Sequence, residues 1–131
     1  MSYSIAEAAD RSGLTAHTLR YYERDGLMLD SVDRSSSGHR RYSDQDLSWI
    51  NMLTCLRSTG MPVREVKRYA ILVRNGDGNE AERLALLLAH RQRVEAQLAE
   101  ATAHLRGIDH KIGLYESKIE HALDLERTPS R

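Results

Sequence analysis

A heptad pattern over residues 80–123 constrains this chain more than any other feature. Mostly apolar side chains recur there in alternating steps of three and four residues, and no glycine or proline intervenes before Gly107. The seam consists of Leu84, Leu87, Arg91, Val94, Leu98, Ala101, Leu105, Ile108, Ile112, Tyr115, Ile119 and Ala122. A repeat of this length predicts a coiled-coil helix. Such a helix would span about 65 Å. The residues before it form at most a small domain, on which a seam of this length could not be buried, so we expect a homodimer.

One seam position, Arg91, carries a charge. Its aliphatic stem can pack in the seam while the guanidinium reaches solvent, or the charge can set the register and orientation of the paired helices. The sequence leaves both interpretations open. Gly107 and Gly113 fall outside the seam, so we expect them to weaken the helix without ending it.

The rest of the chain is long enough for one small domain. A turn-rich segment, Asn75-Gly76-Asp77-Gly78-Asn79, is its clearest boundary. We therefore expect a head over 1–75, a linker over 76–79, the coiled-coil helix over 80–125 and a frayed tail over 126–131.

Two short helices open the head. Ser4 and Glu7 form a capping-box pattern that predicts a helix ending near Gly13. Thr15 caps a second helix that ends near Asp25. Two helices joined by a short turn containing glycine predict a helix-turn-helix motif.

A basic hairpin and two more helices complete the head, so the predicted fold is mainly α. The cluster over residues 35–38 marks a turn between two short strands, which we expect to be the only β structure. Ser43 caps a third helix that runs to Thr59. A fourth helix begins at Pro62 or Val63.

The second helix and the hairpin carry the side chains suited to DNA. In the first turns of that helix, donors can reach base edges and phosphates, while Leu19 and one of the paired tyrosines face the core. The hairpin holds a run of cations without an acid, and local charge decides phosphate binding although the formal net charge is +0. These cations are Arg34, His39, Arg40 and Arg41.

These motifs resemble the winged helix-turn-helix of the MerR family of bacterial transcriptional regulators, over residues 3 to about 75. The matching motifs are Leu19-Arg20-Tyr21-Tyr22-Glu23, Gly26-Leu27, Gly38-His39-Arg40-Arg41-Tyr42 and Asp46-Leu47. The resemblance implies a winged helix-turn-helix head with a small β-hairpin wing. It also implies a dimerisation helix that pairs as an antiparallel coiled coil, whereas the heptad spacing alone does not choose between antiparallel and parallel.

The resemblance also implies a mechanism. Such dimers bind a near-palindromic operator in double-stranded promoter DNA, and they bend and untwist it so that RNA polymerase engages both promoter elements. Carried over residue by residue, the expected DNA contacts are Thr15, His17, Thr18, Arg20 and Tyr21 from the recognition helix and Arg40, Arg41 and Tyr42 from the wing.

Cys55 is the only cysteine, which excludes a disulfide within one chain. The segment from Trp49 to Pro62 is similar to the branch of the family that includes the aldehyde- and nitrosative-stress regulators AdhR and NmlR, in which a single cysteine here is implicated in sensing. A thiolate traps electrophiles such as aldehydes, so Cys55 is the expected sensor in a stress response. The alternative is that Cys55 is a small core residue.

The sequence gives little support for other kinds of site or function. The histidines after residue 80 are scattered, so we expect no metal site and no cofactor. The sequence holds no paired carboxylate site, phosphate loop or nucleophile with its base, so we expect that the chain is not an enzyme. No segment predicts a signal peptide or a membrane span, so we expect a cytoplasmic protein. A coiled-coil adaptor with a protein-binding head and no specific DNA target is the alternative function.

Overall fold

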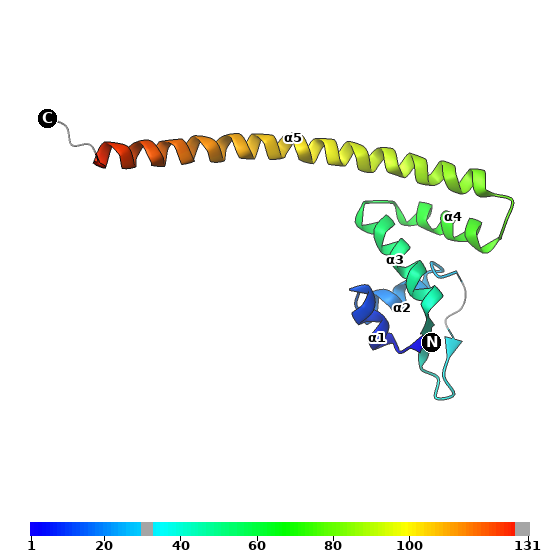
Figure 1. Cartoon of the computed structure of the whole chain (residues 1–131). Coiled ribbons are helices and arrows are strands. Elements are labelled where there is room, and N and C mark those ends of the chain that lie inside the picture. Colours follow the sequence, from blue (N-terminus) through cyan, green and yellow to red (C-terminus); the bar gives the residue numbers. More distant parts are fainter. Residues whose placement is uncertain (30–32, 128–131) are drawn as a thin grey trace. The chain divides into compact units, whose positions relative to one another are not determined.

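A computed structural model describes residues 1–29 and 33–127 of the chain (Figure 1). Its elements are β1 (Ser2–Tyr3), α1 (Ile5–Ser12), α2 (Ala16–Arg24), β2 (Asp33–Arg34), β3 (Arg40–Ser43), α3 (Asp44–Ser58), α4 (Val63–Arg74) and α5 (Glu80–Arg127). The chain divides into two compact units, Met1–His90 and Arg91–Arg131. The mainly helical fold with a hairpin and a long C-terminal helix is confirmed.

The first two helices begin and end where their capping residues predict. Ser4 caps α1 in a full capping box with Glu7, and this hydrogen bonding at Ser4 holds the pKa of the Glu7 carboxyl below its usual value. Gly13 ends α1 at φ 73°, a left-handed conformation that glycine adopts without strain. Thr15 caps α2 by accepting a hydrogen bond from the amide of Thr18.

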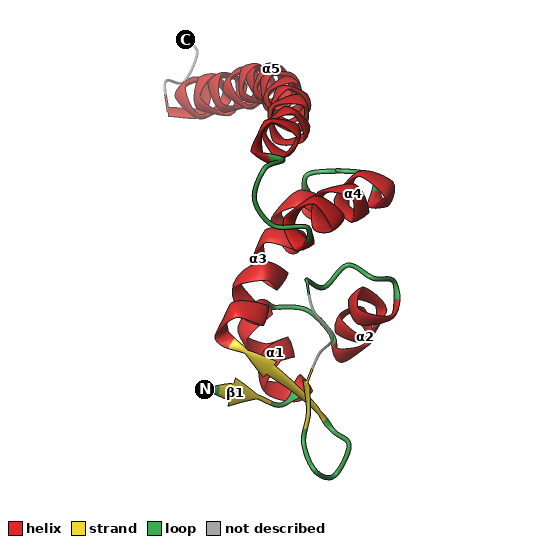
Figure 2. Cartoon of the chain, turned by 90° about the vertical axis from the view of Figure 1, so that its right-hand side faces the viewer, coloured by secondary structure: helices red, strands yellow, loops and turns green. Residues whose placement is uncertain are grey.

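The sheet has three strands, not the two that the sequence predicts. Its order is β1-β3-β2, with both pairs antiparallel (Figure 2). In the register, Tyr3 lies opposite Tyr42 and Arg34 lies opposite Arg40. The expectation that the hairpin would be the only β structure was wrong, because a two-residue strand has no periodicity of its own and forms only against β3, some 40 residues later.

The core of the head gathers buried side chains from α1 to α4, with α3 packed on α1 and α4 packed on α3. Ile50, Leu53 and Val66 are fully buried within it. Trp49 stacks on Tyr69, with 5.7 Å between ring centroids. The indole Nε1–H of Trp49 donates a hydrogen bond of 2.7 Å to the carbonyl of Leu27. This bond fixes the chain directly after α2.

The first turns of α5 belong to the first unit. This unit therefore extends past the linker that we expected at 76–79 and ends at His90. The side-chain Nδ2 of Asn79 donates to the carbonyl of Leu72 at 2.8 Å, and Arg83 Nε donates to Asn79 Oδ1 at 2.6 Å. Leu87 packs against the core cluster and His90 is buried. The packing boundary therefore falls at residue 90, because these turns of α5 still contact the head.

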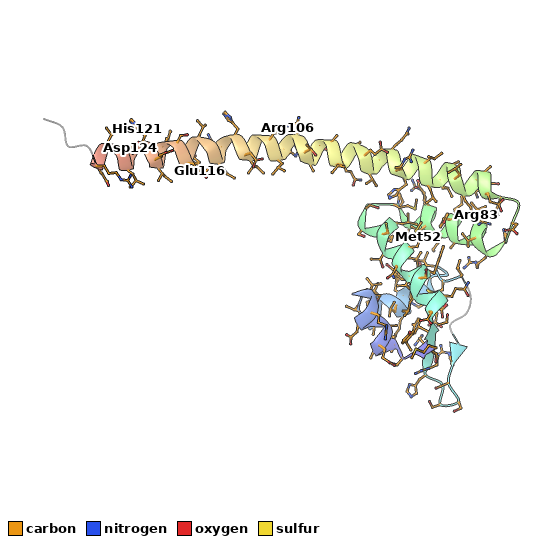
Figure 3. All side chains as sticks on the ribbon, in the orientation of Figure 1. Met52, Arg83, Arg106, Glu116, His121 and Asp124 are labelled. Atoms are coloured by element: carbon orange, nitrogen blue, oxygen red, sulfur yellow. The ribbon has the colours of Figure 1, made fainter. Side chains whose placement is uncertain are left out.

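The second unit is the remainder of α5, whose side chains project on both sides of the helix (Figure 3). The helix continues through Gly107 and Gly113, as expected. Seam residues Leu98 and Ile119 are 66% and 62% exposed in the single chain. Glu126 and Arg127 of the expected frayed tail are still helical, and the rest of that tail, from residue 128, lies outside the described residues. No helix in the described ranges has the length and apolarity to span a membrane.

The Trp49–Leu27 hydrogen bond yields a prediction about stability. Trp49→Phe keeps an aromatic ring but leaves the buried Leu27 carbonyl without the indole N–H. We expect the free energy of unfolding to fall by about 1–3 kcal/mol. Circular dichroism during urea titration measures it, because the variant lacks the only tryptophan of the chain.

Tyr69→Phe is the matched control. It keeps the stacked ring and the indole hydrogen bond, so its unfolding free energy should change by less than about 0.5 kcal/mol. Both variants are compared at one protein concentration, because self-association makes apparent stability depend on concentration. Equal stability of the two variants would show that the indole N–H contributes nothing.

Candidate nucleic-acid interface

The exposed side of α2 carries the polar side chains that the sequence assigns to DNA recognition. His17 and Arg20 are exposed, and Tyr21 is half-buried beside Tyr22, with ring centroids 6.1 Å apart. Leu19 and Tyr22 are buried in the core. The expectation that Leu19 and one tyrosine face the core is confirmed, and the core tyrosine is Tyr22.

The N-terminus of α2 is ordered by two threonines. Thr15 is exposed, and its hydroxyl lies 3.0 Å from the hydroxyl of the half-buried Thr18. The Thr18 amide donates to Thr15 Oγ1 at 3.1 Å. Because Thr15 already serves as the helix cap, contact with DNA would have to use its remaining hydrogen-bonding capacity.

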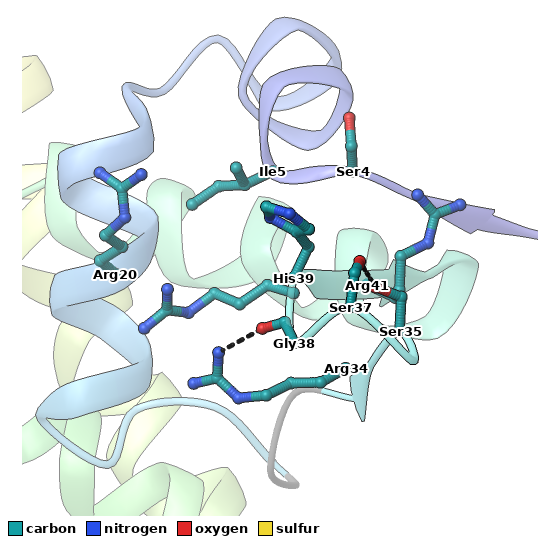
Figure 4. Close-up of a pocket in the computed structure, with 10 residues that line it drawn as sticks. Ser4, Ile5, Arg20, Arg34, Ser35, Ser37, Gly38, His39 and Arg41 are labelled. Carbon is teal, nitrogen blue, oxygen red and sulfur yellow. Dashed lines mark hydrogen bonds between the residues drawn. The ribbon is translucent and has the colours of Figure 1, made fainter.

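A basic concavity of about 370 Å³, which we call the wing pocket, lies between α2, the hairpin and the start of α1 (Figure 4). Arg20 enters it from α2, opposite Arg34, His39 and Arg41 of the hairpin. None of the lining residues that the structure describes is acidic. The lining residues are Ser4, Ile5, Arg20, Arg34, Ser35, Ser37, Gly38, His39, Arg40 and Arg41.

The wing arginines are held by contacts within the head. Arg40 pairs with Glu23 of α2, and the Arg34 guanidinium lies 3.5 Å from the same carboxylate. Arg41 donates from Nη2 to the carbonyl and the hydroxyl of Ser2, both at 3.0 Å. A guanidinium has five N–H donors, so these contacts fix the direction of each arginine and leave donors for a phosphate.

Tyr42 does not fit its expected role as a DNA contact. Its side chain is 0% exposed, and it is the largest fully buried side chain of the described chain. Burial also raises the pKa of its phenol. Successive residues of a strand point to opposite faces, and on β3 the face of Tyr42 is packed against the helices. The prediction that Tyr42 contacts DNA directly was therefore wrong. Tyr42 packs in the core of the head and holds β3 of the wing in place.

A second concavity, of about 490 Å³, lies along the other flank of α2, and we call it the helix groove. His17, Thr18 and Tyr21 border it from α2, and Arg57 and Ser58 border it from the C-terminal end of α3. Arg57 is exposed, and its Nη1 donates to the carbonyl of Met61 at 2.6 Å. The lining residues are Leu14, His17, Thr18, Tyr21, Tyr22, Thr54, Arg57 and Ser58.

The structure therefore adds cations that the expected contact list lacks. Arg34 and His39 line the wing pocket beside the predicted Arg40 and Arg41, and the basic stretch over 34–41, which contains no acid, was the signal for them. Arg57 had no such signal. It follows α2 by more than 30 residues, and only the packing of α3 brings it beside the recognition helix.

Cys55 is exposed on α3. The alternative that it is a small core residue is therefore wrong for the single chain. Cys55 borders neither of the two concavities, so it is separate from the candidate DNA-binding surface. Over residues 1–29 and 33–127, no group of three or more His, Cys, Asp or Glu side chains could hold a metal ion.

Comparison with known proteins gives this geometry a family. Residues 3–70 match the MerR HTH family of regulatory proteins, and residues 47–111 match the MerR, DNA binding family. An HTH-type transcriptional regulator of Haemophilus influenzae is 39% identical over 116 residues, which are 88% of this chain and 85% of that protein. The HTH-type transcriptional regulator AdhR of Bacillus subtilis is 41% identical over 70% of this chain and 64% of its own length.

A solved structure agrees with these relatives. The crystal structure of HiNmlR, a MerR family regulator lacking the sensor domain, bound to promoter DNA, matches with a TM-score of 0.80 and 38% identity. The match covers 89% of this chain and 92% of that one. With a family match over more than half of its residues and a 39% identical relative along most of both chains, this chain belongs to the MerR family of helix-turn-helix regulatory proteins.

Proposed function

We propose that this chain is a transcriptional regulator that binds a near-palindromic promoter operator as a homodimer. The wing pocket carries the proposal, because four arginines and a histidine gather there beside the exposed donors of α2. Cations of this kind hold the phosphate backbone while helix side chains reach base edges. The similarity to HiNmlR, which was crystallised with promoter DNA, supports this function.

The two concavities fit the two walls of a major groove. A helix is about 10–12 Å wide with its side chains and fits a major groove about 12 Å wide. A sugar-phosphate backbone then runs along each flank of α2. The wing pocket would meet one backbone, and Arg57 in the helix groove would meet the other. The proposed contacts are Thr15, His17, Thr18, Arg20 and Tyr21 from α2, Arg40 and Arg41 from the wing, and Arg57 from α3.

The exposed seam of α5 supports the homodimer. Large apolar side chains that remain exposed along so long a helix require a partner surface, and a second copy supplies a matching seam. By its resemblance to the family, the pairing is antiparallel. The dimer would bend and untwist the operator, so that RNA polymerase engages both promoter elements.

The competing functions have less support. The relatives are transcriptional regulators, and none of the comparisons supports a protein-binding adaptor. We propose that the chain acts without enzymatic activity. A bacterial regulator of promoter DNA works in the cytoplasm, and we propose that location.

Substitutions on the two flanks of α2 test the DNA-binding proposal. Arg20→Ala should weaken operator binding by about 1–3 kcal/mol, because it removes a donor to base edges or phosphate. Arg57→Gln should weaken operator and random DNA about equally and reduce the slope of log affinity against log salt by about one, because it removes a phosphate contact. Fluorescence anisotropy over a series of salt concentrations measures both effects.

Arg106→Ala is the matched control, because Arg106 is an exposed arginine of α5 outside the seam. Its operator affinity and salt slope should equal those of the wild type. A wild-type protein that binds operator and random DNA equally would contradict the proposed function. An Arg57→Gln variant with an unchanged slope would remove only Arg57 from the contacts.

The seam yields a prediction about assembly. Leu105→Glu places a charge in the seam, so sedimentation should show monomers at a concentration at which the wild type is dimeric. Operator affinity should fall with the dimer. Ala103→Glu adds the same charge on the opposite side of the helix and should leave the dimer intact. Dimers of Leu105→Glu would show that α5 does not pair through this seam.

We also propose that Cys55 senses thiol-reactive electrophiles such as aldehydes. Its exposure leaves the sulfur accessible in the single chain. Addition to an aldehyde forms a sulfur–carbon bond and opens the carbonyl π bond, and the thiol proton ends on the oxygen as a hydroxyl. Relatives in the AdhR and NmlR branch support this stress-response function.

The proposal predicts a response that depends on one thiol. Aldehyde treatment should change the operator affinity of the wild type and leave that of Cys55→Ala unchanged. Untreated Cys55→Ala should bind like the wild type, because loss of an exposed thiol costs less than about 0.5 kcal/mol of stability. An equal aldehyde response in both proteins would eliminate Cys55 as the sensor.

A further inference from the structure

His90 is the one buried polar or charged residue of the described chain, at 5% exposure. It lies on α5 at the last position of the first compact unit. Its Nε2 is 2.7 Å from the hydroxyl of Thr59, the C-capping residue of α3. A partly buried hydrogen bond therefore joins α5 to the end of α3, through two residues that are 31 apart in sequence.

The Thr59 hydroxyl also has partners on the backbone of α3, the carbonyls of Cys55 and Leu56. The Thr59 hydroxyl has one proton and lies 2.7 Å from the carbonyl of Cys55. A carbonyl only accepts, so the hydroxyl donates to Cys55. The lone pairs of the hydroxyl can accept from His90 in the tautomer whose Nε2 carries the proton, because the donor and acceptor roles of this pair depend on the tautomer. In that tautomer a chain of hydrogen bonds runs from the His90 imidazole through Thr59 to the backbone of Cys55.

The same geometry places the Cys55 side chain beside this link. Residues four apart on a helix lie on one face, so Cys55 and Thr59 are neighbours on the last turn of α3. The Thr59 amide also donates to the Cys55 carbonyl, at 3.3 Å. A bulky group on the Cys55 sulfur would crowd Thr59, which has to remain in place to accept from His90.

We propose that His90 and Thr59 form a latch that couples the C-terminal turn of α3, and with it Cys55, to the start of α5. His90 is a positioning residue in this device and need not touch DNA. The latch gives the proposed sensor a route from a thiol on the head to the dimerisation helix. It deepens the proposed function and rests on it only for the regulatory role of Cys55.

Hydrogen exchange of the backbone amides at residues 84–90, measured on the chain of 131 residues, tests the latch without DNA. Thr59→Val keeps the shape of the side chain but cannot accept from the buried imidazole N–H. Exchange at these amides should quicken about tenfold. Thr59→Ser keeps the hydroxyl and should exchange like the wild type.

Thr102→Val is the matched control, because the Thr102 hydroxyl donates to the Leu98 carbonyl at 2.8 Å on the same helix. It should leave exchange at residues 84–90 unchanged. Circular dichroism verifies that each variant is folded. If Thr59→Val fails to fold, His90→Leu against His90→Gln makes the same comparison, because glutamine supplies an N–H donor. Wild-type exchange in Thr59→Val, or in His90→Leu when that pair is used, would overturn the latch.

Alkylation with N-ethylmaleimide tests the coupling to Cys55. The sulfur bonds to one alkene carbon, the carbon–carbon π bond opens, and the thiol proton ends on the other carbon. The adduct should quicken exchange at residues 84–90 in the wild type, add little in Thr59→Val, and have no effect in Cys55→Ala. A wild-type protein whose exchange is unchanged by the adduct, or an equal increase in Thr59→Val, would overturn the coupling.

Operator affinity of the same alkylated samples separates the two proposals. If exchange at residues 84–90 changes but affinity does not, the latch stands and the sensing role of Cys55 falls. If affinity changes in the wild type and equally in Thr59→Val, Cys55 is a sensor that acts by another route, and the coupling through Thr59 falls.

Discussion

The candidate interface depends on how α3 and α4 hold the short loop that follows α2. The Trp49 indole donates to the Leu27 carbonyl at 2.7 Å, and Arg74 donates to the carbonyls of Gly26 and Met28 at 3.0 and 2.7 Å. Three consecutive carbonyls are thus satisfied by side chains from later helices. The bond to Leu27 is buried, and an unsatisfied buried carbonyl is costly, so this loop has little freedom at Leu27. The position of the recognition helix is therefore set by the packing of the head as well as by its own helix-turn-helix.

Local chemistry explains why much of the head could be predicted from the sequence. Ser4, Thr15 and Ser43 each cap a helix through a side-chain oxygen, an interaction that spans three residues and is readable without tertiary structure. The heptad spacing of α5 is readable in the same way. Strand β1 could not be predicted, because its two residues pair with a strand far along the chain. The packing boundary at His90 was missed for a similar reason, since it depends on tertiary contacts.

The candidate site shows the same division. Exposed His17 and Arg20 follow from the helical spacing of α2, and the basic run of the hairpin indicates its cations. Tyr42 carries the chemistry of a DNA contact within a matching motif, yet its strand turns it into the core. Arg57 carries no local signal and reaches the interface only through the packing of α3. Residue type and motif therefore indicate which chemistry is present, while strand direction and helix packing decide which side chains can use it.

Glu23 gives the wing arginines an intramolecular competitor. A DNA phosphate that reached Arg34 and Arg40 would compete with a carboxylate that α2 already presents to them, unless it bound their free guanidinium edges. A DNA duplex of poorly fitting shape would gain little binding free energy from replacing Glu23 by a phosphate, because Glu23 already neutralises part of the charge of Arg34 and Arg40. A well-shaped operator can offer phosphates that bind the free guanidinium edges without dislodging Glu23. The acid on the reading helix would thus suppress indiscriminate binding and make discrimination between sites depend on backbone shape.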